Sequence, residues 1–536
     1  MRRVGVLLAV AMYVALPATA GYAAVPKNSG LPEDLGRATL VWGDCPPVEV
    51  AGVARDPRQQ CARLSVPLDY RAPHGRTITV EVSRIATAKP GQRRGVLLFN
   101  PGGPGGSGLD FPDQLLPVLP TAVTDAYDLI GFDPRGIGYS TPVTCGIPAG
   151  TPPDLVLPYP APDGSIDRNV AYGQQIAQSC AQLSGDLLPY VTTANTARDM
   201  DRIRAALGES KLSYLGYSYG TYLGAVYTTL FPQRSDRILL DSAVDPNLVW
   251  YQLWRTWDQA IALRLPDFTA WTAARDATYH LGATQAAVQA TYDALGARFD
   301  RDPVTLPNGL VVDGNLVREL TRSALYNDLL FPTLATEWAQ LTALPVGATP
   351  PPAVAAAIAA LRPTSQPSDG TAQLPADNHT AALYTVVCDD VAWPRSLATY
   401  TRNVATGRRL FPDTAGMPDN LWPCAFWPTR PIEPPVAVTD RGPRNVLILQ
   451  NLRDPATAWV SGFGLREAMG KRAAFVSVDQ GGHGAYLITD APCVADIATA
   501  FLTTGALPGH DTFCPGQSPD TVSPLVARPV VRLPGL

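Results

Sequence analysis

Histidine and lysine are scarce in this chain, and each scarcity excludes a class of site. The five histidines are scattered through 536 residues and no C-x-x-C pair occurs. A zinc site therefore has almost no support, and we expect neither a metal nor a cofactor. Only four of the 42 basic residues are lysine, no basic run is present, and the net charge is −5. A nucleic-acid partner is not expected for such a chain.

Long apolar runs are also missing. After the amino-terminal stretch, no segment approaches the about twenty uninterrupted apolar residues that a membrane-spanning helix needs. Residues 1–20 combine two arginines, an apolar stretch and the small residues Ala18-Thr19-Ala20, which is the pattern of a secretory signal peptide. We expect cleavage near Ala20 and release of a secreted monomer with no stable membrane association. No cysteine lies near the cleavage site, which argues against a lipid anchor.

Cysteines are few but even in number. All eight stand after the predicted cleavage site, at Cys45, Cys61, Cys145, Cys180, Cys388, Cys424, Cys493 and Cys514. In an exported chain an even set indicates disulfide bonds. Sequence alone does not fix the connectivity, but pairing neighbours in chain order closes modest loops and is the pairing that we expect. Buried free thiols are the alternative.

Short apolar runs alternate with helical stretches along most of the chain. The predicted strands are Ala62–Tyr70, Thr77–Ile85, Val96–Asn100, Tyr127–Asp133, Leu212–Gly216, Ile238–Ser242, Val446–Asn451 and Ala474–Asp479. The first two are polar on one side, as antiparallel edge strands are, whereas the middle ones are apolar like parallel strands buried on both faces. Because helical stretches separate the later strands, we predict an α/β fold with an eight-stranded, mostly parallel sheet.

The long stretch between the sixth and seventh predicted strands differs in character. Trp250, Trp254 and Trp257 share one face of a helix there, and we interpret them as core packing rather than as a stripe that lines a substrate site. We predict that residues 245–440 form a helical cap inserted into a core made of residues 21–244 and 441–514. Residues 515–536 are Pro-rich and are expected to form an extended surface tail.

The sequence Gly216-Tyr217-Ser218-Tyr219-Gly220 is the one G-x-S-x-G pattern in the chain. The pentapeptide alone is a weak signal, but an apolar strand precedes it and helical spacing follows it. On a sharp strand-to-helix turn a serine projects its hydroxyl from the sheet, and flanking glycines allow the tight backbone. This context makes Ser218 the predicted nucleophile.

A nucleophilic serine needs a base and an acid that orients the base. Among the five histidines, His483 stands between glycines directly after the last apolar strand, where a loop can bring its imidazole over the sheet edge. Asp454 follows the preceding strand after a short turn. The resulting order Ser218, Asp454, His483 is that of α/β-hydrolase triads. Asp479 is nearer to His483 in sequence, but it ends a strand and is the weaker candidate.

A glycine-rich loop, residues 100–108, follows the third predicted strand. Glycines let backbone N–H groups approach a substrate oxygen without obstruction by side chains, so we predict an oxyanion hole with one donor from Gly102 or Gly103 and the other from Tyr219. A phosphate-binding loop is disfavoured because no Gly-Lys-Ser/Thr follows. We interpret the Asp133-Pro134-Arg135-Gly136 turn after the fourth strand as structural support for this loop.

Five motifs recur in order with these strands: VPLDY at 66–70, NPGGPG at 100–105, DPRG at 133–136, TANTARD at 193–199 and GYSYG at 216–220. Together they resemble the secreted bacterial tripeptidyl aminopeptidases, which are α/β-hydrolases related to prolyl aminopeptidase. The segment with Asp454, His483, Cys493 and Cys514 also looks like the TAP-like C-terminal domain of that family. The resemblance implies an α/β-hydrolase fold from about Trp42 to Cys514.

The same resemblance implies release of short N-terminal peptides, often tripeptides, from substrates with a free amino terminus through a Ser-His-Asp acyl-enzyme. Such an enzyme needs a closed cap and an acidic group for the α-ammonium, and the cap offers Glu319, Glu337, Asp389 and Asp390. A carboxylic-ester hydrolase (esterase or lipase) with the same triad is the first alternative, because fold and triad do not choose between amide and ester. A catalytically inactive envelope-binding protein is the second, and the complete triad argues against it.

Overall fold

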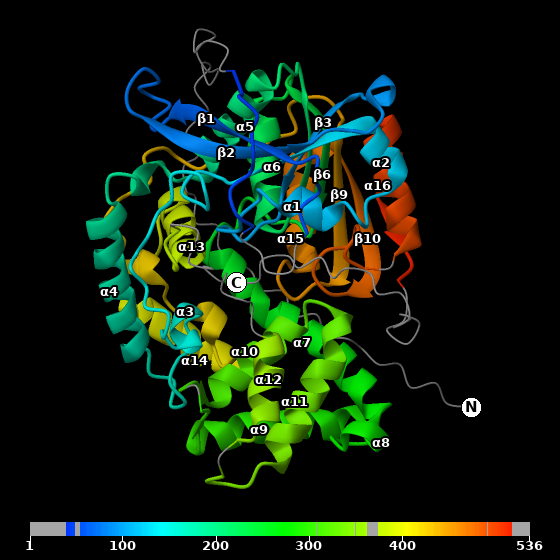
Figure 1. Ribbon diagram of the computed structural model, residues 1–536. Helices are drawn as coiled ribbons and strands as arrows, with labels where there is room; N and C mark the ends of the chain where they lie inside the picture. Colours follow the sequence, from blue (N-terminus) through cyan, green and yellow to red (C-terminus); the bar gives the residue numbers. More distant parts are fainter. Residues whose placement is uncertain are drawn as a thin grey trace.

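The computed structural model describes residues 39–48, 54–307, 309–348, 350–361, 374–489 and 491–516. The predicted signal peptide, residues 1–20, lies outside these ranges, as does all but the beginning of the predicted tail, residues 515–536. A twisted sheet crosses the upper part of the molecule, and a group of helices lies below its lower edge (Figure 1).

Within the described residues, nine strands form the central sheet. In spatial order they are β1 (Gln60–Pro67), β2 (Thr77–Ile85), β4 (Tyr127–Phe132), β3 (Gly95–Asn100), β5 (Leu212–Tyr217), β6 (Ser235–Asp241), β9 (Val446–Arg453), β10 (Ala473–Gly481) and β11 (Thr512–Cys514). β2 pairs antiparallel with β1 and β4, and the other neighbours are parallel. The predicted α/β-hydrolase sheet is thus confirmed with all eight predicted strands. The ninth, β11, was missed because three residues are too few to give a sequence pattern.

The central strands are buried on both faces because their alternate side chains enter two different cores. In β3, Val96 and Leu98 join one core, and Leu97 and Phe99 join the other. The first face is covered by α5 (Thr193–Ala206), α6 (Tyr219–Leu230) and α15 (Trp459–Met469), and the second by α1 (Phe111–Leu115), α2 (Thr121–Ala126) and α16 (Pro492–Thr504). This arrangement is the reason that these strands read as uninterrupted apolar runs.

The first core continues into the helices below the sheet. These are α7 (Tyr251–Ala273), α8 (Asp276–Tyr279), α9 (Gln285–Arg301), α10 (Gly314–Ala324), α11 (Phe331–Ala343), α12 (Pro352–Leu361), α13 (Asn378–Asp390) and α14 (Leu397–Leu410), with the small hairpin β7 (Val304–Thr305) and β8 (Val311–Val312). Phe268 packs edge-on against Phe331 and Trp338, with ring centroids 5.2 and 4.9 Å apart. Each such pair adds about 0.5–1.5 kcal/mol beyond area burial. All these elements fall between β6 and β9, so we propose residues 245–440 as the cap.

One helical segment that precedes the nucleophile in the chain also packs on the cap. It contains α3 (Pro153–Val156) and α4 (Asp167–Ser184), which come between β4 and β5. The backbone of α4 at Gly173 fits closely against Leu421 and Phe426, and Figure 1 shows α4 on the same side of the molecule as α13 and α14. Part of the range 21–244, which we predicted as core, therefore packs on the cap as a helical layer. The sequence contains no sign of this, because the segment lies far from the cap along the chain.

Four disulfides pair the cysteines in the predicted order, as Cys45–Cys61, Cys145–Cys180, Cys388–Cys424 and Cys493–Cys514. The last of them ties the start of α16 to β11, and the third ties α13 to the segment that follows α14. Their sequence separations run from 16 to 36 residues. Closing loops of this size restricts the unfolded chain and contributes about 3–4 kcal/mol each in the chain-entropy estimate.

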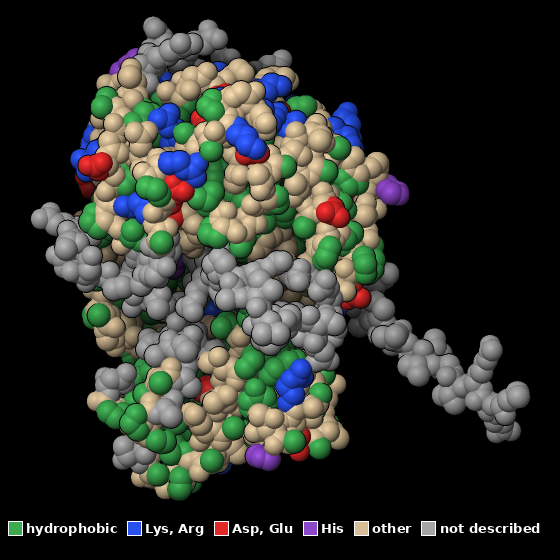
Figure 2. All heavy atoms as spheres, turned by 45° about the vertical axis from the view of Figure 1, so that its right-hand side comes forward, with side chains coloured by type: hydrophobic (Ala, Val, Ile, Leu, Met, Phe, Trp, Pro, Cys, Tyr) green, Lys and Arg blue, Asp and Glu red, His purple; other side chains and the backbone are tan. Residues whose placement is uncertain are grey.

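The surface in Figure 2 shows basic and acidic side chains interspersed over the upper part of the molecule. This face therefore has no continuous basic patch of the kind that follows nucleic-acid phosphates. Of the helices in the described ranges, none is both long and apolar enough to cross a membrane.

Candidate active site

Ser218 stands at the sharp turn between β5 and α6. Its φ of 56° and ψ of −125° lie in a region that residues other than glycine rarely adopt, as expected for a nucleophile turn. The Ser218 N–H donates to the Asp241 carbonyl oxygen (3.0 Å), which holds the turn against β6. A Cβ at Gly216 would lie 2.5 Å from the Gly220 carbonyl oxygen, so the turn also requires glycine there. The hydroxyl is thereby presented at the carboxyl edge of β5.

Asp454 and His483 follow β9 and β10 and are hydrogen-bonded to each other. His483 Nδ1 lies 3.0 Å from Asp454 Oδ1 and 2.9 Å from Oδ2, and both side chains are buried. Asp454 Oδ1 also accepts the backbone N–H groups of Ala456 (2.8 Å) and Thr457 (2.9 Å). Burial alone would raise the pKa of Asp454, but the interactions with His483 and these N–H groups outweigh it and hold the pKa below its usual value. An ionised Asp454 can therefore fix the orientation of His483.

The loop that carries His483 is anchored by two residues that sequence reasoning missed. Asp241, at the end of β6, accepts the backbone N–H groups of Ala485 (2.9 Å) and Tyr486 (2.7 Å). Tyr326, from the cap, accepts the His483 N–H at its carbonyl oxygen (2.8 Å) and packs its ring against the imidazole with centroids 5.1 Å apart. The cap thus takes part in placing the histidine. Only Asp241 had a sequence signal, because it ends an apolar strand.

The glycine loop after β3 lies directly against the nucleophile turn. A Cβ on Gly102 would come within 2.9 Å of Ser218 Cβ, so only glycine fits. The Gly102 N–H already donates to Asn100 Oδ1 (3.1 Å). In contrast, the N–H groups of Gly103 and Tyr219 have no acceptor among the described residues, and both residues line a pocket with Ser218. Of the two predicted glycines, the geometry therefore favours Gly103 as the first oxyanion donor, with Tyr219 as the second.

Asp133 supports this loop, as the sequence predicted, whereas Arg135 supports neighbouring backbone at Pro67, Leu68 and Tyr190. The Asp133 carboxylate accepts hydrogen bonds from Ser107 Oγ (2.7 Å) and the Gly108 N–H (3.1 Å), so it fixes the far end of the loop. Arg135 is fully buried and forms two hydrogen bonds of 2.6 and 2.7 Å to Asp199. Both residues hold backbone in place and have no contact with the nucleophile turn that would give them a chemical role.

A pocket opens beside the nucleophile. Its wall is formed by Trp250, which directly precedes α7, by Leu253, Trp254 and Trp257 of α7, and by Tyr326. The interpretation of the tryptophans as core packing alone was therefore incomplete: they are buried, and they also form the surface that a substrate would touch. α7 begins shortly after β6 at the sheet edge where the catalytic turns meet, which is why its first turns lie over them.

As far as the described residues show, none of the four carboxylates predicted as candidates for the substrate amine lines this pocket. Glu319 is buried and paired with Arg322 through two contacts of 2.9 Å, so its charge is already matched. Glu337, on α11, is fully buried, and its oxygens have no hydrogen-bond partner in the described part of the chain. Burial raises the pKa of Glu337 to about 8, and a protonated carboxyl forms no ion pair with an ammonium group.

Glu337→Gln should stabilise the fold more strongly as the pH rises and should leave peptide hydrolysis unchanged. The unfolded chain releases the Glu337 proton near pH 4.5, whereas the folded state keeps it until about pH 8, so the native protein loses stability as the pH rises between these values. The free energy of unfolding of Glu337→Gln, relative to that of the wild type, should therefore increase by about 2–3 kcal/mol between pH 5 and pH 7. Urea denaturation at the two pH values measures this change, and an equal difference at both would contradict it.

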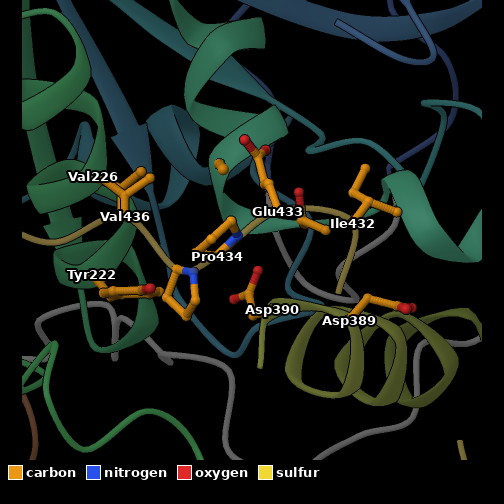
Figure 3. Close-up of a pocket in the computed structure, with 11 residues that line it drawn as sticks. Tyr222, Val226, Asp389, Asp390, Ile432, Glu433, Pro434 and Val436 are labelled. Carbon is orange, nitrogen blue, oxygen red and sulfur yellow. The ribbon is translucent and has the colours of Figure 1, made fainter. Parts of the chain in front are cut away.

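Asp389 and Asp390 lie at the end of α13 and line a second pocket, in which Figure 3 shows Asp390 close to Pro434. Asp389 accepts a hydrogen bond from Trp427 Nε1 (2.9 Å). Asp390 accepts one from Trp250 Nε1 (3.1 Å), so it lies behind the tryptophan wall of the first pocket. Burial raises the pKa of Asp390 to about 6. Of the four candidates it is the one for which the described residues show a direct hydrogen bond to a side chain in the lining of the pocket beside the nucleophile.

A serine on a strained strand-to-helix turn, a buried His–Asp pair from two later strands and a glycine loop with unpaired N–H groups define a serine hydrolase of the α/β-hydrolase class. Comparison with known proteins agrees. Residues 95–330 match the family model for the alpha/beta hydrolase fold, and residues 412–514 match that for TAP-like proteins.

Similar proteins show to which family within this class the chain belongs. The chain is 37% identical to the tripeptidyl aminopeptidase of Streptomyces coelicolor, over 89% of this chain and 86% of the relative. It is 30% identical to serine protease Hip1 (88% and 90%) and to carboxylesterase B (88% and 89%) of Mycobacterium tuberculosis. Among solved structures, an epoxide hydrolase from an endophytic Streptomyces covers 85% of this chain and 100% of its own at 15% identity and a TM-score of 0.34. The chain belongs to the tripeptidyl aminopeptidase family of α/β-hydrolases, and it is a serine hydrolase.

Proposed function

We propose that the protein is a secreted serine exopeptidase that releases short N-terminal peptides, tripeptides in particular, from peptides and proteins with a free amino terminus. The observation that carries this proposal is the 37% identity, across 89% of the chain, to a tripeptidyl aminopeptidase. The hydrogen-bonded pair of Asp454 and His483 and the strained turn at Ser218 support it at the site. Four disulfides favour an oxidising compartment outside the cytoplasm.

In the proposed reaction, Ser218 Oγ attacks the carbonyl carbon of the scissile bond while His483 Nε2 takes the hydroxyl proton. Asp454 holds the Nδ1–H of His483 and stabilises the imidazolium that forms. The tetrahedral oxyanion accepts hydrogen bonds from the N–H groups of Gly103 and Tyr219, each of which lowers the barrier by about 3–4 kcal/mol. His483 then protonates the leaving amine, and water hydrolyses the acyl-enzyme by the same route.

The pocket supports release of a short piece with a free amino terminus. Its lining joins Ser218 to side chains of α7 in the proposed cap, so the acyl part of a bound peptide would lie under the cap. The candidate carboxylates lie outside its lining, but indole faces can receive an α-ammonium group through cation–π contact, worth about 0.5–2 kcal/mol. Trp250, Trp254 and Trp257 supply indole rings to the lining.

A panel of mono-, di- and tripeptidyl chromogenic anilides, each with a free or an acetylated amino terminus, tests the proposal. We expect free tripeptidyl anilides to be the best substrates. Acetylation removes the positive charge and should lower kcat/KM by about 3- to 30-fold, since that range corresponds to one cation–π contact. If acetylated peptides were cleaved as well as free ones, the aminopeptidase assignment would fail.

A carboxylic-ester hydrolase is the second candidate, because the chain is also 30% identical to a carboxylesterase B over 88% of its length. The same triad and oxyanion donors serve ester hydrolysis. Including p-nitrophenyl esters in the panel separates the two functions: an esterase would cleave these esters and leave every peptide anilide intact.

A further inference from the structure

Trp254 differs from its two neighbours in the pocket wall because its hydrogen-bond donor is unused. Trp250 Nε1 donates to Asp390 Oδ2 (3.1 Å), and Trp257 Nε1 donates to the Ala456 carbonyl oxygen (2.7 Å). Trp254 Nε1 is buried and has no acceptor in the part of the chain that the structure describes. A buried donor without an acceptor costs free energy, so one that is retained in a native fold calls for an explanation.

The unused donor belongs to a side chain in the wall of the pocket beside the nucleophile. Trp254 lines the pocket that also contains Ser218, and its ring lies between those of Trp250 and Trp257, with centroids 5.6 and 4.7 Å away. Leu253 completes this apolar side of the wall. A peptide carbonyl that enters such a wall gives up its hydrogen bonds to water and needs a donor from the protein.

Trp422 provides an internal comparison. It stacks on Trp254 with ring centroids 5.6 Å apart, it is equally buried, and its Nε1 also lacks an acceptor among the described residues. Trp422 is not part of the lining of the pocket beside Ser218. Each of the two indoles therefore has an unpaired donor, but of the two only Trp254 belongs to the lining of the pocket.

We propose that Trp254 is a substrate-binding residue whose indole N–H donates a hydrogen bond to a backbone carbonyl oxygen of the short peptide in the pocket. This inference rests on the proposed function, which places a short peptide on the acyl side of Ser218. Formation of the bond breaks no existing hydrogen bond of the protein, since the donor is unused. Trp254 would thereby favour peptides over simple acyl esters, which have no second carbonyl to accept the bond.

Trp254→Phe and Trp422→Phe test this role, because each variant keeps an aromatic ring and removes one unpaired N–H. kcat and KM are measured with a free tripeptidyl anilide and with p-nitrophenyl acetate. We expect kcat/KM of Trp254→Phe to fall about three- to tenfold further for the peptide than for the acetate, mainly because KM rises. This fold-change corresponds to the loss of one neutral hydrogen bond. Trp422→Phe should change both substrates to the same extent.

The two substrates also separate a binding defect from a folding defect, which would lower both rates together and reduce Tm. Equal changes for peptide and acetate in Trp254→Phe, or the same peptide-specific loss in Trp422→Phe, would overturn the assignment of Trp254. A wild-type protein that cleaves the acetate but no peptide anilide would overturn the proposed function itself, and the inference with it. The wild-type rates therefore report on the function, and the comparison of variants reports on Trp254.

Discussion

Ser218→Ala is expected to lower kcat for tripeptidyl anilides by about 10⁵- to 10⁶-fold while the fold is retained. The hydroxyl at this turn is the proposed nucleophile, and what remains in the variant is stabilisation by the oxyanion donors and substrate binding. Alanine at a φ of 56° is no more strained than serine. Adding His483→Ala should cost almost nothing further, because residues that act as a unit have non-additive effects. Initial rates and Tm of the wild type and of the two variants measure this.

Ser213→Ala is the matched control for that experiment. Ser213 lies at the other end of β5, where its hydroxyl donates to Asp236 Oδ2 (3.2 Å), and its loss should leave catalysis intact. A serine-directed fluorophosphonate should label the wild type and Ser213→Ala but not Ser218→Ala. Absence of label on the wild type would favour a catalytically inactive binding protein, and retained activity in Ser218→Ala would remove that residue from the mechanism.

The proposed catalytic residues could be selected from the sequence because each one directly follows an apolar strand. Carboxyl ends of parallel strands meet at one edge of a sheet, so residues that leave those ends converge. Ser218 follows β5, Asp454 follows β9 and His483 follows β10, and the spatial order β5-β6-β9-β10 brings the three turns together. Strand pattern and chain order were therefore enough to select them among many serines, aspartates and histidines.

The pocket wall could not be predicted in the same way. A tryptophan that packs in a core and one that lines a substrate pocket give the same apolar periodicity, and Trp254 does both. The difference depends on where the cap places α7 relative to the sheet, which residues distant in sequence determine. Tyr326 illustrates this, because its contact with the histidine loop joins two segments with no shared sequence signal.

The positions of the four substrate-amine candidates outside the pocket lining could not be predicted, for a related reason. A sequence shows which carboxylates the cap contains, but not which partners they meet. Glu319 is neutralised by Arg322 one turn further along its own helix, whereas Glu337 is buried among apolar side chains with no partner in the described residues. The Asp390 carboxylate accepts a hydrogen bond from the indole N–H of Trp250. Which side chain each carboxylate contacts depends on tertiary packing, so it can be determined only from the three-dimensional structure.

Asp454→Asn is expected to lower kcat by about 10⁴-fold while KM stays near the wild-type value. Asp454 Oδ1 accepts the backbone N–H groups of Ala456 (2.8 Å) and Thr457 (2.9 Å), so an asparagine there keeps its oxygen on these donors and turns its NH₂ group toward His483. The NH₂ group takes the place of the oxygen that lies 2.9 Å from Nδ1, and it favours the tautomer in which the imidazole accepts at Nδ1 and carries its proton at Nε2. In that tautomer it cannot take the proton of Ser218.

Asp479→Asn is the control that makes this result specific, because Asp479 is the carboxylate nearer to His483 in sequence. Its side chain is 49% exposed and pairs with Arg453 Nη1 at 2.7 Å, and an exposed pair contributes little, about 0–1 kcal/mol. We expect Asp479→Asn to keep nearly full kcat with the tripeptidyl anilide and an unchanged Tm. A larger loss in Asp479→Asn than in Asp454→Asn would transfer the role of the acid to Asp479. Because only a carboxylate in contact with Nδ1 can fix the tautomer, the comparison distinguishes the residue that is close in space from the one that is close in the chain.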